Sequence, residues 1–269
     1  MLKLSIITIN LNNCRGLEKT IWSVINQKFT SVEHLVIDGA STDKSVEIIK
    51  RHEGNITYWV SEPDKGIYNA MNKGIAKATG EYCLFLNSGD VLVDKNTIEN
   101  VFLAMPTEDI LYGDMFFDKR LQTYPDELTL NYLIDRSLGH GASIIKRELF
   151  IKYGNFDEQL KIVADWEFFF RVIILKSCSY RHLKNQTISR FNMDGVSTSH
   201  KHIERHNQEK ISVFKKMLPE LIQNDFDKEV IAKSLLKLSL YENSKLSQVA
   251  LRIENSRFFY LFKKLYHSI

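Results

Sequence analysis

Residues 84–90 read LFLNSGD, an apolar run that stops on a short polar turn ending in the carboxylate of Asp90. The run predicts a buried strand, and a strand delivers the residues that follow it to one edge of a sheet. Open α/β folds bind their ligands at that edge. A carboxylate there, beside residues small enough to admit a phosphate, suits a divalent cation that carries a nucleotide diphosphate.

The residues around this stretch alternate between strand and helix patterns. Short connections between such elements predict a mainly parallel sheet covered by helices on both faces. The polar interruptions of the strands would then gather along one sheet edge. The expected strands are 4–9, 34–37, 56–60 and 82–86, the expected helices are 17–25, 46–49 and 67–78, and the polar ends are 8–10, 38, 61–64 and 87–90.

The pattern is less regular after residue 105. Residues 110–117 and 142–145 predict strands, and residues 168–175 predict a strongly apolar helix introduced by 164–167. From about residue 200 the chain reads as helices rich in Lys and Leu. We therefore expect an α/β domain over residues 1–205 and a helical extension, basic and rich in aromatic residues, over 206–269.

Composition narrows the class of protein. The chain has 269 residues, 44% hydrophobic and 26% charged, with a formal net charge of +3. This charge is too small to imply a nucleic-acid partner. Three scattered cysteines without a CxxC motif argue against a disulfide framework or a zinc cluster and suit a reducing compartment. With no signal-peptide pattern and no apolar run near the ~18 residues of a membrane span, we expect a cytoplasmic protein.

Two nucleotide-binding signatures are absent from the sequence. No predicted strand is followed by GxGxxG, the pyrophosphate turn of dinucleotide-binding dehydrogenases. No GxxxxGK[ST] motif is present either, which argues against a P-loop kinase or ATPase. A nucleotide would have to be held by side chains and a metal ion.

The order of the motifs resembles that of the family 2 glycosyltransferases. The resemblance covers roughly residues 1–200, and the chain is similar to bacterial members that act in capsule, exopolysaccharide or lipopolysaccharide assembly. It implies a GT-A fold, a nucleotide-sugar donor, a divalent cation (Mg²⁺ or Mn²⁺) and inversion at the anomeric carbon. The matching segments are SIIT at 5–8 with Asn10, DGASTD at 38–43, SEPDKGIY at 61–68, LNSGD at 86–90, HGA at 140–142 and ADWE at 164–167.

The resemblance places the donor around the ends of the first three strands. It implies that Asp38 binds the base, usually uracil, since a carboxylate can accept from the ring N–H. Thr8 and Asn10 would line the same pocket. Asp-Gly is also a common turn dipeptide, so a role in a turn is the other explanation of Asp38. Other donor-binding candidates are Asp64 and Lys65, near the base and ribose, and Asn87 and Ser88 in the 87–90 turn.

The metal motif departs from the commonest form of the family. Many members carry Asp-x-Asp and a further acid, whereas Asn87 and Gly89 stand at the acidic positions here. Asp90 is then the expected metal ligand. Magnesium often takes only one or two protein carboxylates, with phosphate oxygens and waters completing its octahedron. A turn or a helix cap is the other explanation of Asp90.

Asp165 matches the catalytic base of the family, which precedes an aromatic-rich helix ending in Arg, here residues 166–171. Inverting transfer needs a base to take the proton of the acceptor hydroxyl. Asp165 could instead cap the helix. His140 lies between Gly139 and Gly141, which allow close approach of a ligand, so we expect it to contact the acceptor.

The predicted function is therefore an inverting glycosyltransferase that uses a uridine diphosphate sugar, a hexose or N-acetylhexosamine, and a glycan or lipid-linked acceptor. A catalytically weak nucleotide-sugar-binding partner subunit is the alternative, favoured by the sparse metal motif. A nucleotidyltransferase would need a Gly- and Arg-rich loop, of which residues 10–16 supply only Arg15 and Gly16. The basic, aromatic tail suits contact with anionic lipid, or equally packing against the domain or a second copy of the chain.

Overall fold

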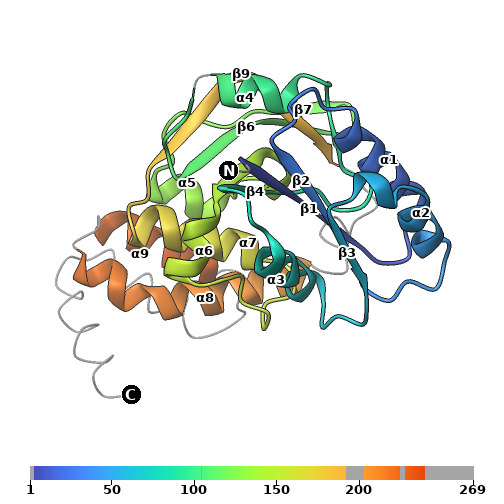
Figure 1. Ribbon diagram of the computed structural model, residues 1–269. Helices are drawn as coiled ribbons and strands as arrows, with labels where there is room; N and C mark the ends of the chain where they lie inside the picture. The colour runs from blue at the N-terminus through green and yellow to red at the C-terminus, as the bar shows by residue number, and fades with distance from the viewer. Residues whose placement is uncertain (1–2, 104, 192–202, 225–227, 240–269) are drawn as a thin grey trace.

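The computed structural model of the protein describes residues 3–103, 105–191, 203–224 and 228–239. In these residues, nine strands form one sheet with helices on both faces (Figure 1). The strands are β1 (Leu4–Asn10), β2 (Val32–Asp38), β3 (Tyr58–Ser61), β4 (Tyr82–Phe85), β5 (Val91–Leu92), β6 (Ile110–Phe117), β7 (Arg120–Gln122), β8 (Ser143–Lys146) and β9 (Tyr180–Phe191). The helices are α1 (Cys14–Ile25), α2 (Ser45–Arg51), α3 (Ile67–Lys77), α4 (Thr97–Leu103), α5 (Leu130–Asp135), α6 (Arg147–Tyr153), α7 (Ala164–Phe170), α8 (Ile203–Gln223) and α9 (Lys228–Ser239).

The strand order of the sheet is β3-β2-β1-β4-β8-β6-β9-β5, with β7 paired to β6. The first four strands are parallel to one another. Strand β8 runs antiparallel to both β4 and β6, so β6 and its parallel neighbour β9 share the direction of β1. The sheet is therefore mostly parallel, and the predicted α/β architecture is confirmed.

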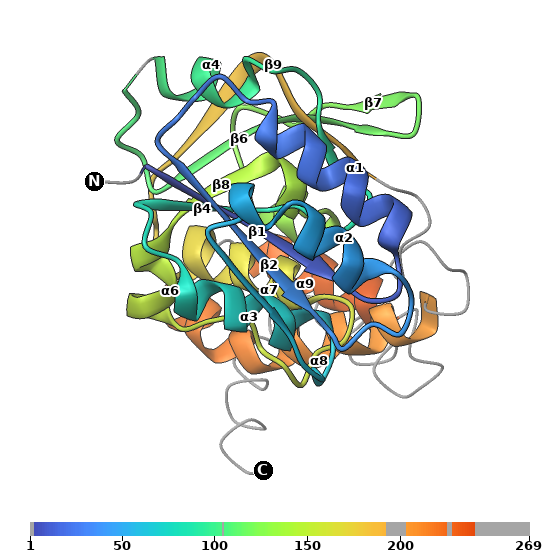
Figure 2. The same ribbon diagram turned by 45° about the vertical axis from the view of Figure 1, so that its right-hand side comes forward.

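Helices α1 and α2 cover one face of the sheet and α3 covers the other, as both views show (Figure 2). The chain moves outward from β1 to β3 and then returns past both strands to β4. Right-handed crossovers place the helices of these two directions on opposite faces. The faces bury separate clusters, and Val36 packs with Leu17 and Ile49 under α1 and α2.

The register of the first strands decides where their polar ends lie. Asn10 at the end of β1 pairs with Asp38 at the end of β2, and Asp38 pairs in turn with Ser61 at the end of β3. All seven residues of β1 are buried, so its backbone is fixed on both faces. The predicted convergence of polar residues at one edge follows from this register.

The second half of the chain differs from its sequence pattern. Residues 180–191 form the twelve-residue strand β9, which the sequence analysis did not predict. The predicted helix over 168–175 is two elements, α7 and then a π-helical segment, η3 (Arg171–Leu175). Two short 3₁₀ helices, η1 (Glu53–Asn55) and η2 (His140–Ala142), complete the described elements.

The expected boundary at residue 205 falls inside α8. Val213, Phe214 and Leu221 of α8 belong to the same buried hydrophobic cluster as β1, β4 and β6. The basic aromatic tail lies in residues 240–269, outside the described part of the chain. Among the described helices, none combines the length and the hydropathy that crossing a bilayer requires.

Candidate active site

A cavity of about 660 Å³ opens at the edge where the strands β1 and β4 end. Its walls come from the β1–α1 connection, the start of α3, the residues after β4, η2 and the start of α7. The predicted site residues that line this cavity are Asn10, Asp64, Asn87, Ser88, Asp90, His140 and Asp165.

Hydrogen bonds fix the turn that follows β4. The amide of Ser88 donates to the carbonyl of Ile9 at 3.0 Å, which ties the turn to the end of β1. Gly89 has a φ of 107°, a conformation that a residue with a side chain rarely adopts. The carboxylate of Asp90 is 1% exposed and accepts from the amide of Asn87 at 3.2 Å. The turn thus presents Asp90 in a fixed orientation at the wall of the cavity.

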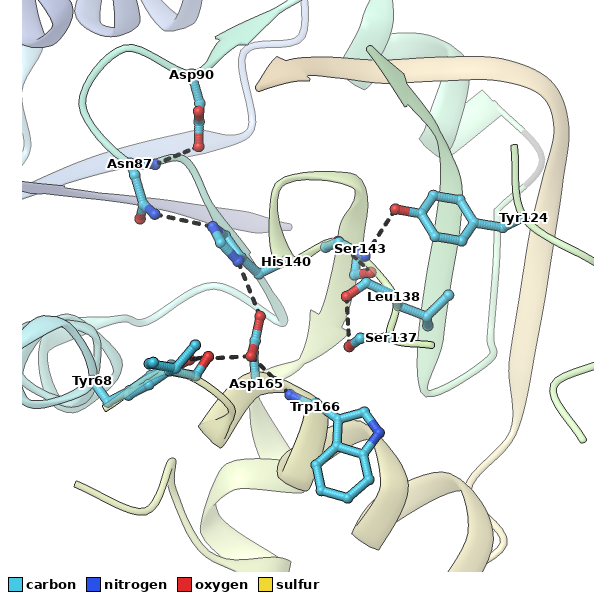
Figure 3. A network of polar contacts seen from close by, with 12 residues as sticks. Tyr68, Asn87, Asp90, Tyr124, Ser137, Leu138, His140, Ser143, Asp165 and Trp166 are labelled. Carbon is cyan, nitrogen blue, oxygen red and sulfur yellow. Dashed lines mark hydrogen bonds and ion pairs between the residues drawn. The ribbon is translucent and has the colours of Figure 1, made fainter. Parts of the chain in front are cut away.

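His140 connects this turn to Asp165 (Figure 3). Its Nε2 atom lies 3.1 Å from Nδ2 of Asn87, and its Nδ1 atom lies 3.4 Å from Oδ2 of Asp165. A ring that carries a proton on Nδ1 donates to the carboxylate of Asp165, and Nε2 faces the side-chain amide group of Asn87. His140 is therefore occupied on both ring nitrogens by groups of the cavity wall.

Asp165 accepts three hydrogen bonds. The hydroxyl of Tyr68 lies 3.1 Å from its Oδ1 atom, the amide of Trp166 donates to Oδ1 at 2.8 Å, and His140 faces Oδ2. Burial disfavours the charged carboxylate, but these bonds and the charge of His140 outweigh it and hold the pKa of Asp165 below its usual value. Asp165 is thus an ionised group at neutral pH, as a general base must be.

The pKa of His140 moves in the opposite direction. Burial disfavours the imidazolium, yet the hydrogen bond to Asp165 and the negative charges of Asp165 and Asp90 raise the pKa of His140 above its ordinary value. The side chains of His140 and Asp165 are 14% and 20% exposed, so both are accessible from the cavity. Opposite shifts of this kind mark candidate acid–base sites.

Asp165 is close to the start of α7, and its Oδ1 atom accepts from the amide of Trp166 in the first turn. The N-cap position of α7 is Val163, and Asp165 lies within the first turn.

Arg171, at the start of the π-helical segment, pairs with Glu167 at 2.8 Å and donates to backbone carbonyls of the α6–α7 connection. π-helical turns occur frequently at functional sites.

The 87–90 turn offers oxygen ligands that suit a hard cation. The Oδ1 atom of Asn87 is buried and has no hydrogen-bond partner within the described residues, and it lies in the same wall as Asp90. An amide oxygen and a carboxylate are ligands for Mg²⁺ or Mn²⁺, and a diphosphate would supply further oxygens. The described residues contain no group of three or more His, Cys, Asp or Glu that could hold a metal alone. The turn thus fits a cation that arrives with a phosphate ligand.

Three predicted donor residues are not brought to the cavity. Thr8 is fully buried and its hydroxyl contacts Nε2 of His34 at 3.0 Å. Lys65 is exposed, and its side chain does not line the cavity. Asp38 is also fully buried.

The carboxylate of Asp38 is already saturated with hydrogen bonds. It accepts from Asn10 Nδ2 at 2.7 Å, from the amide and hydroxyl of Ser41, and from the hydroxyl of Ser61 at 2.6 Å. Asp38 therefore joins the ends of β1, β2 and β3, and contact with a base would require one of these bonds to break. Asp64, which does line the cavity, approaches Gly39 so closely that a Cβ there would lie 2.4 Å from its Oδ2 atom.

The structure adds cavity residues that the sequence analysis missed. Tyr68 is the last residue of the 61–68 motif, and its place in that motif was the sequence signal that could have identified it. Asn13 follows the polar end of β1 and donates to the carbonyl of Ser88 at 2.8 Å. Lys161 and Phe191 have no local sequence signal, because they reach the cavity only through the packing of distant segments.

Comparisons with known proteins agree with this architecture. The family model described as "Glycosyl transferase family 2" matches residues 5–176. An uncharacterised glycosyltransferase of Mycobacterium tuberculosis is 33% identical over 183 residues, which cover 64% of this chain and 69% of the relative. A PGL/p-HBAD biosynthesis glycosyltransferase of Mycobacterium bovis is 29% identical over 171 residues, covering 61% and 67% of the two chains.

Solved structures with the same fold are more distant in sequence. Residues 1–349 of S. aureus TarS, in complex with UDP-GlcNAc, superpose with a TM-score of 0.68 at 19% identity, covering 87% of this chain and 71% of that chain. The mannosyltransferase PcManGT of Pyrobaculum calidifontis, in complex with GDP-Man and Mn²⁺, superposes with a TM-score of 0.61 at 17% identity, covering 95% and 80%. The chain belongs to glycosyl transferase family 2 and has the GT-A fold.

Proposed function

We propose that the protein transfers a hexose or N-acetylhexosamine, with inversion, from a uridine diphosphate donor to a hydroxyl of a glycan or lipid-linked acceptor in cell-surface polysaccharide synthesis. The observation that carries this proposal is that Asp165 and the 87–90 turn line one cavity and are joined through His140. A base and a diphosphate-binding turn on one cavity meet the geometric need of an in-line displacement.

In this reaction Asp165 takes the proton of the acceptor hydroxyl. The acceptor oxygen forms a bond to the anomeric carbon while the bond from that carbon to the diphosphate breaks. The nucleotide diphosphate leaves with the bonding electrons from the opposite face, which inverts the configuration. The lowered pKa of Asp165 keeps it ionised and able to accept the proton. Tyr68 and His140 hold the carboxylate in place.

Asp90 and Asn87 would hold the divalent cation, with Ser88 beside the diphosphate. When bound, such a cation stabilises the negative charge that develops on the leaving diphosphate. Asp64 is the carboxylate in position to meet the base or ribose, since it lines the cavity and Asp38 does not. The structure of TarS contains UDP-GlcNAc, which supports testing UDP sugars first. The structure of PcManGT contains GDP-Man, so GDP sugars are the second group of donors to test.

The test combines nucleotide binding with turnover. Thermal shift should detect UDP and UDP sugars, more strongly with Mn²⁺ or Mg²⁺, because a ligand stabilises the state that it binds. Release of UDP from the donor should fall about 10²–10⁴-fold in Asp165→Asn with nucleotide binding retained. Asp90→Ala should weaken the part of nucleotide binding that depends on the cation. Asp94→Asn replaces an exposed carboxylate and should change neither UDP release nor nucleotide binding.

Donor turnover that is indifferent to both Asp165→Asn and Asp90→Ala would overturn the proposal. Nucleotide-sugar binding without turnover in the unaltered protein would favour the second candidate, a catalytically weak partner subunit. The observation behind that candidate is the single carboxylate of the 87–90 turn.

A further inference from the structure

A glutamate of α8 contacts the backbone just before α7. The carboxylate of Glu209 accepts from three backbone amides: that of Lys161, at 3.0 and 3.1 Å from its two oxygens, that of Ile162, at 2.9 Å, and that of Val163, at 3.3 Å. The side chain of Glu209 is only 11% exposed. Three consecutive backbone amides are thus satisfied by one carboxylate that lies 46 to 48 residues later in the chain.

Such bonds are strong and specific. A carboxylate that accepts from backbone amides forms charge-assisted hydrogen bonds, which are shorter and roughly twice as strong as neutral ones. Arg205, one turn earlier on α8, pairs with Glu209 at 3.0 Å and orients its carboxylate. Val163 is the N-cap residue of α7, and Asp165 follows two residues later. Glu209 therefore fixes the path by which the chain enters the helix that carries Asp165.

The same segment is held on its other side by α3. The hydroxyl of Tyr68 donates to the carbonyl of Ile162 at 2.7 Å, and Asn69 and Asn72 both donate to the carboxylate of Glu158 at 2.9 Å. The carbonyl of Ile162 thus faces α3 while its amide faces α8.

The next residue of α8 holds the other flank of Asp165. Lys210 is 8% exposed, and its Nζ atom donates to the carbonyls of Ile134 and Asp135 at 3.2 and 3.3 Å. The same atom lies 4.7 Å from the ring centroid of Trp166, the residue directly after Asp165. Two successive residues of α8 therefore contact the chain immediately before and immediately after Asp165.

We infer that Glu209 is a positioning residue for Asp165, and that α8 is part of the catalytic apparatus. Glu209 does not line the cavity, and it acts through the backbone of residues 161–163. This inference rests on the proposed function, in which Asp165 is the base. It goes beyond the family match, which ends at residue 176.

The experiment compares three variants of the full-length chain. Glu209→Ala removes the carboxylate, and Glu209→Gln keeps one acceptor oxygen without the charge. Glu220→Ala is the matched control, because Glu220 lies on the same helix and pairs with Lys176 at the protein surface. Hydrogen exchange of the peptide over residues 158–170, thermal-shift binding of UDP, and steady-state donor turnover are measured for each.

We expect faster amide exchange at residues 161–163 and a kcat about 10- to 100-fold lower in Glu209→Ala, since small misplacements of a reacting group cost about that much. Glu209→Gln should give a smaller loss of kcat, UDP binding should stay within about twofold, and Glu220→Ala should resemble the unaltered protein. Unchanged exchange, a kcat loss no larger than in Glu220→Ala, or loss of UDP binding parallel to kcat would each overturn the inference. No turnover in the unaltered protein would instead refute the proposed function, with the exchange result still deciding whether Glu209 orders this segment.

Discussion

The Nδ1 atom of His140 lies 3.4 Å from the Oδ2 atom of Asp165, and this contact joins the two halves of the candidate active site. The other ring nitrogen of His140 contacts the side-chain amide of Asn87, and the backbone N–H of Asn87 donates to the carboxylate of Asp90. One imidazole therefore links the 87–90 turn to Asp165 (Figure 3). The glycines that flank His140 predict contact with the acceptor, whereas both ring nitrogens of His140 face groups of the protein.

Replacing His140 should move the acid limb of the pH–rate profile. The pKa of Asp165 lies below its ordinary value of 3.8, although burial opposes this, because His140 and the other donors favour the charged form. In His140→Gln the charge is lost, the pKa of Asp165 rises, and the acid limb of kcat should shift to higher pH. Measurement of kcat from pH 3 to 8 tests this, with His52→Gln as the control, because His52 packs against Trp22. An unmoved limb would contradict the assigned coupling.

The same pair should make stability depend on pH in a defined window. The lowered pKa of Asp165 stabilises the fold above its ordinary value of 3.8, and this contribution is lost as the pH falls through the folded pKa. The raised pKa of His140 stabilises the fold below its ordinary value of 6.5, and this contribution is lost as the pH rises through the folded pKa. The difference in unfolding free energy between the unaltered protein and His140→Gln should thus be largest between these values. Urea titrations at pH 3, 5 and 9 would measure it, and an equal difference at all three would refute the ion pair.

The residues at the strand ends were predictable because parallel strands must bring their carboxyl ends to one edge. This rule brought Asn10, Asn87 and Asp90 together from local patterns alone. It did not indicate which way a buried side chain turns, so Thr8 and Asp38 were placed in the cavity although each is satisfied by a neighbouring strand.

Contacts made by distant segments left no local signal. Strand β9 carries a run of polar residues at 184–187, which conceals its pairing with β6. The bonds from Glu209 to residues 161–163 depend on the packing of α8 against α7, and a lone glutamate in a helix rich in Lys and Glu is indistinguishable from a solvated one. Such residues are found only once tertiary packing is known.

A second carboxylate in the 87–90 turn should strengthen cation binding. The Oδ1 atom of Asn87 has no hydrogen-bond partner among the described residues, and Asn87 lines the same cavity as Asp90, so Asn87→Asp adds charge where an oxygen ligand is available. More ligand charge tightens binding of hard cations, and we expect affinity for Mn²⁺ with UDP to rise by about tenfold. Isothermal titration measures it. Asn100→Asp, which adds the same charge at an exposed position of α4, should leave affinity unchanged, and equal affinities in both variants would count against this ligand set.

Glu33 should stabilise the edge of the sheet opposite the cavity. It is 3% exposed and accepts from Ser5 Oγ at 2.5 Å and from the amides of Thr79 and Gly80 at 2.6 and 3.1 Å. Glu33→Gln replaces one acceptor oxygen by an NH₂ group, which cannot accept from this hydroxyl or these amides. It should cost about 1–3 kcal/mol of unfolding free energy.

The cost of Glu33→Gln should also depend on pH. Burial raises the pKa of Glu33, but the hydrogen bonds outweigh burial and leave the pKa below its ordinary value of 4.5. The stabilisation is therefore present above that value and fades as the pH falls. Urea denaturation at pH 7 and pH 3 should give a larger difference at pH 7. Glu47→Gln, an exposed change on α2, should stay within about 0.5 kcal/mol at both, and a larger gap at pH 3 would reverse the sign of the argument.

The turn before β4 should tolerate no side chain at Gly80. A Cβ there would lie 2.7 Å from the backbone nitrogen of Ser5 and 2.8 Å from the carbonyl carbon of Leu4, and β1 cannot shift because all its residues are buried. Gly80→Ala should therefore cost about 1–3 kcal/mol, measured by urea denaturation. At Gly54 a Cβ meets nothing within 4 Å, so Gly54→Ala should change stability by between zero and about 1 kcal/mol in the favourable direction. Since Gly80 precedes β4 at the edge opposite the cavity, kcat of the folded protein should be unchanged in both variants. A Gly80→Ala protein as stable as Gly54→Ala would show that the turn at Gly80 packs less closely against Leu4 and Ser5 than these distances require.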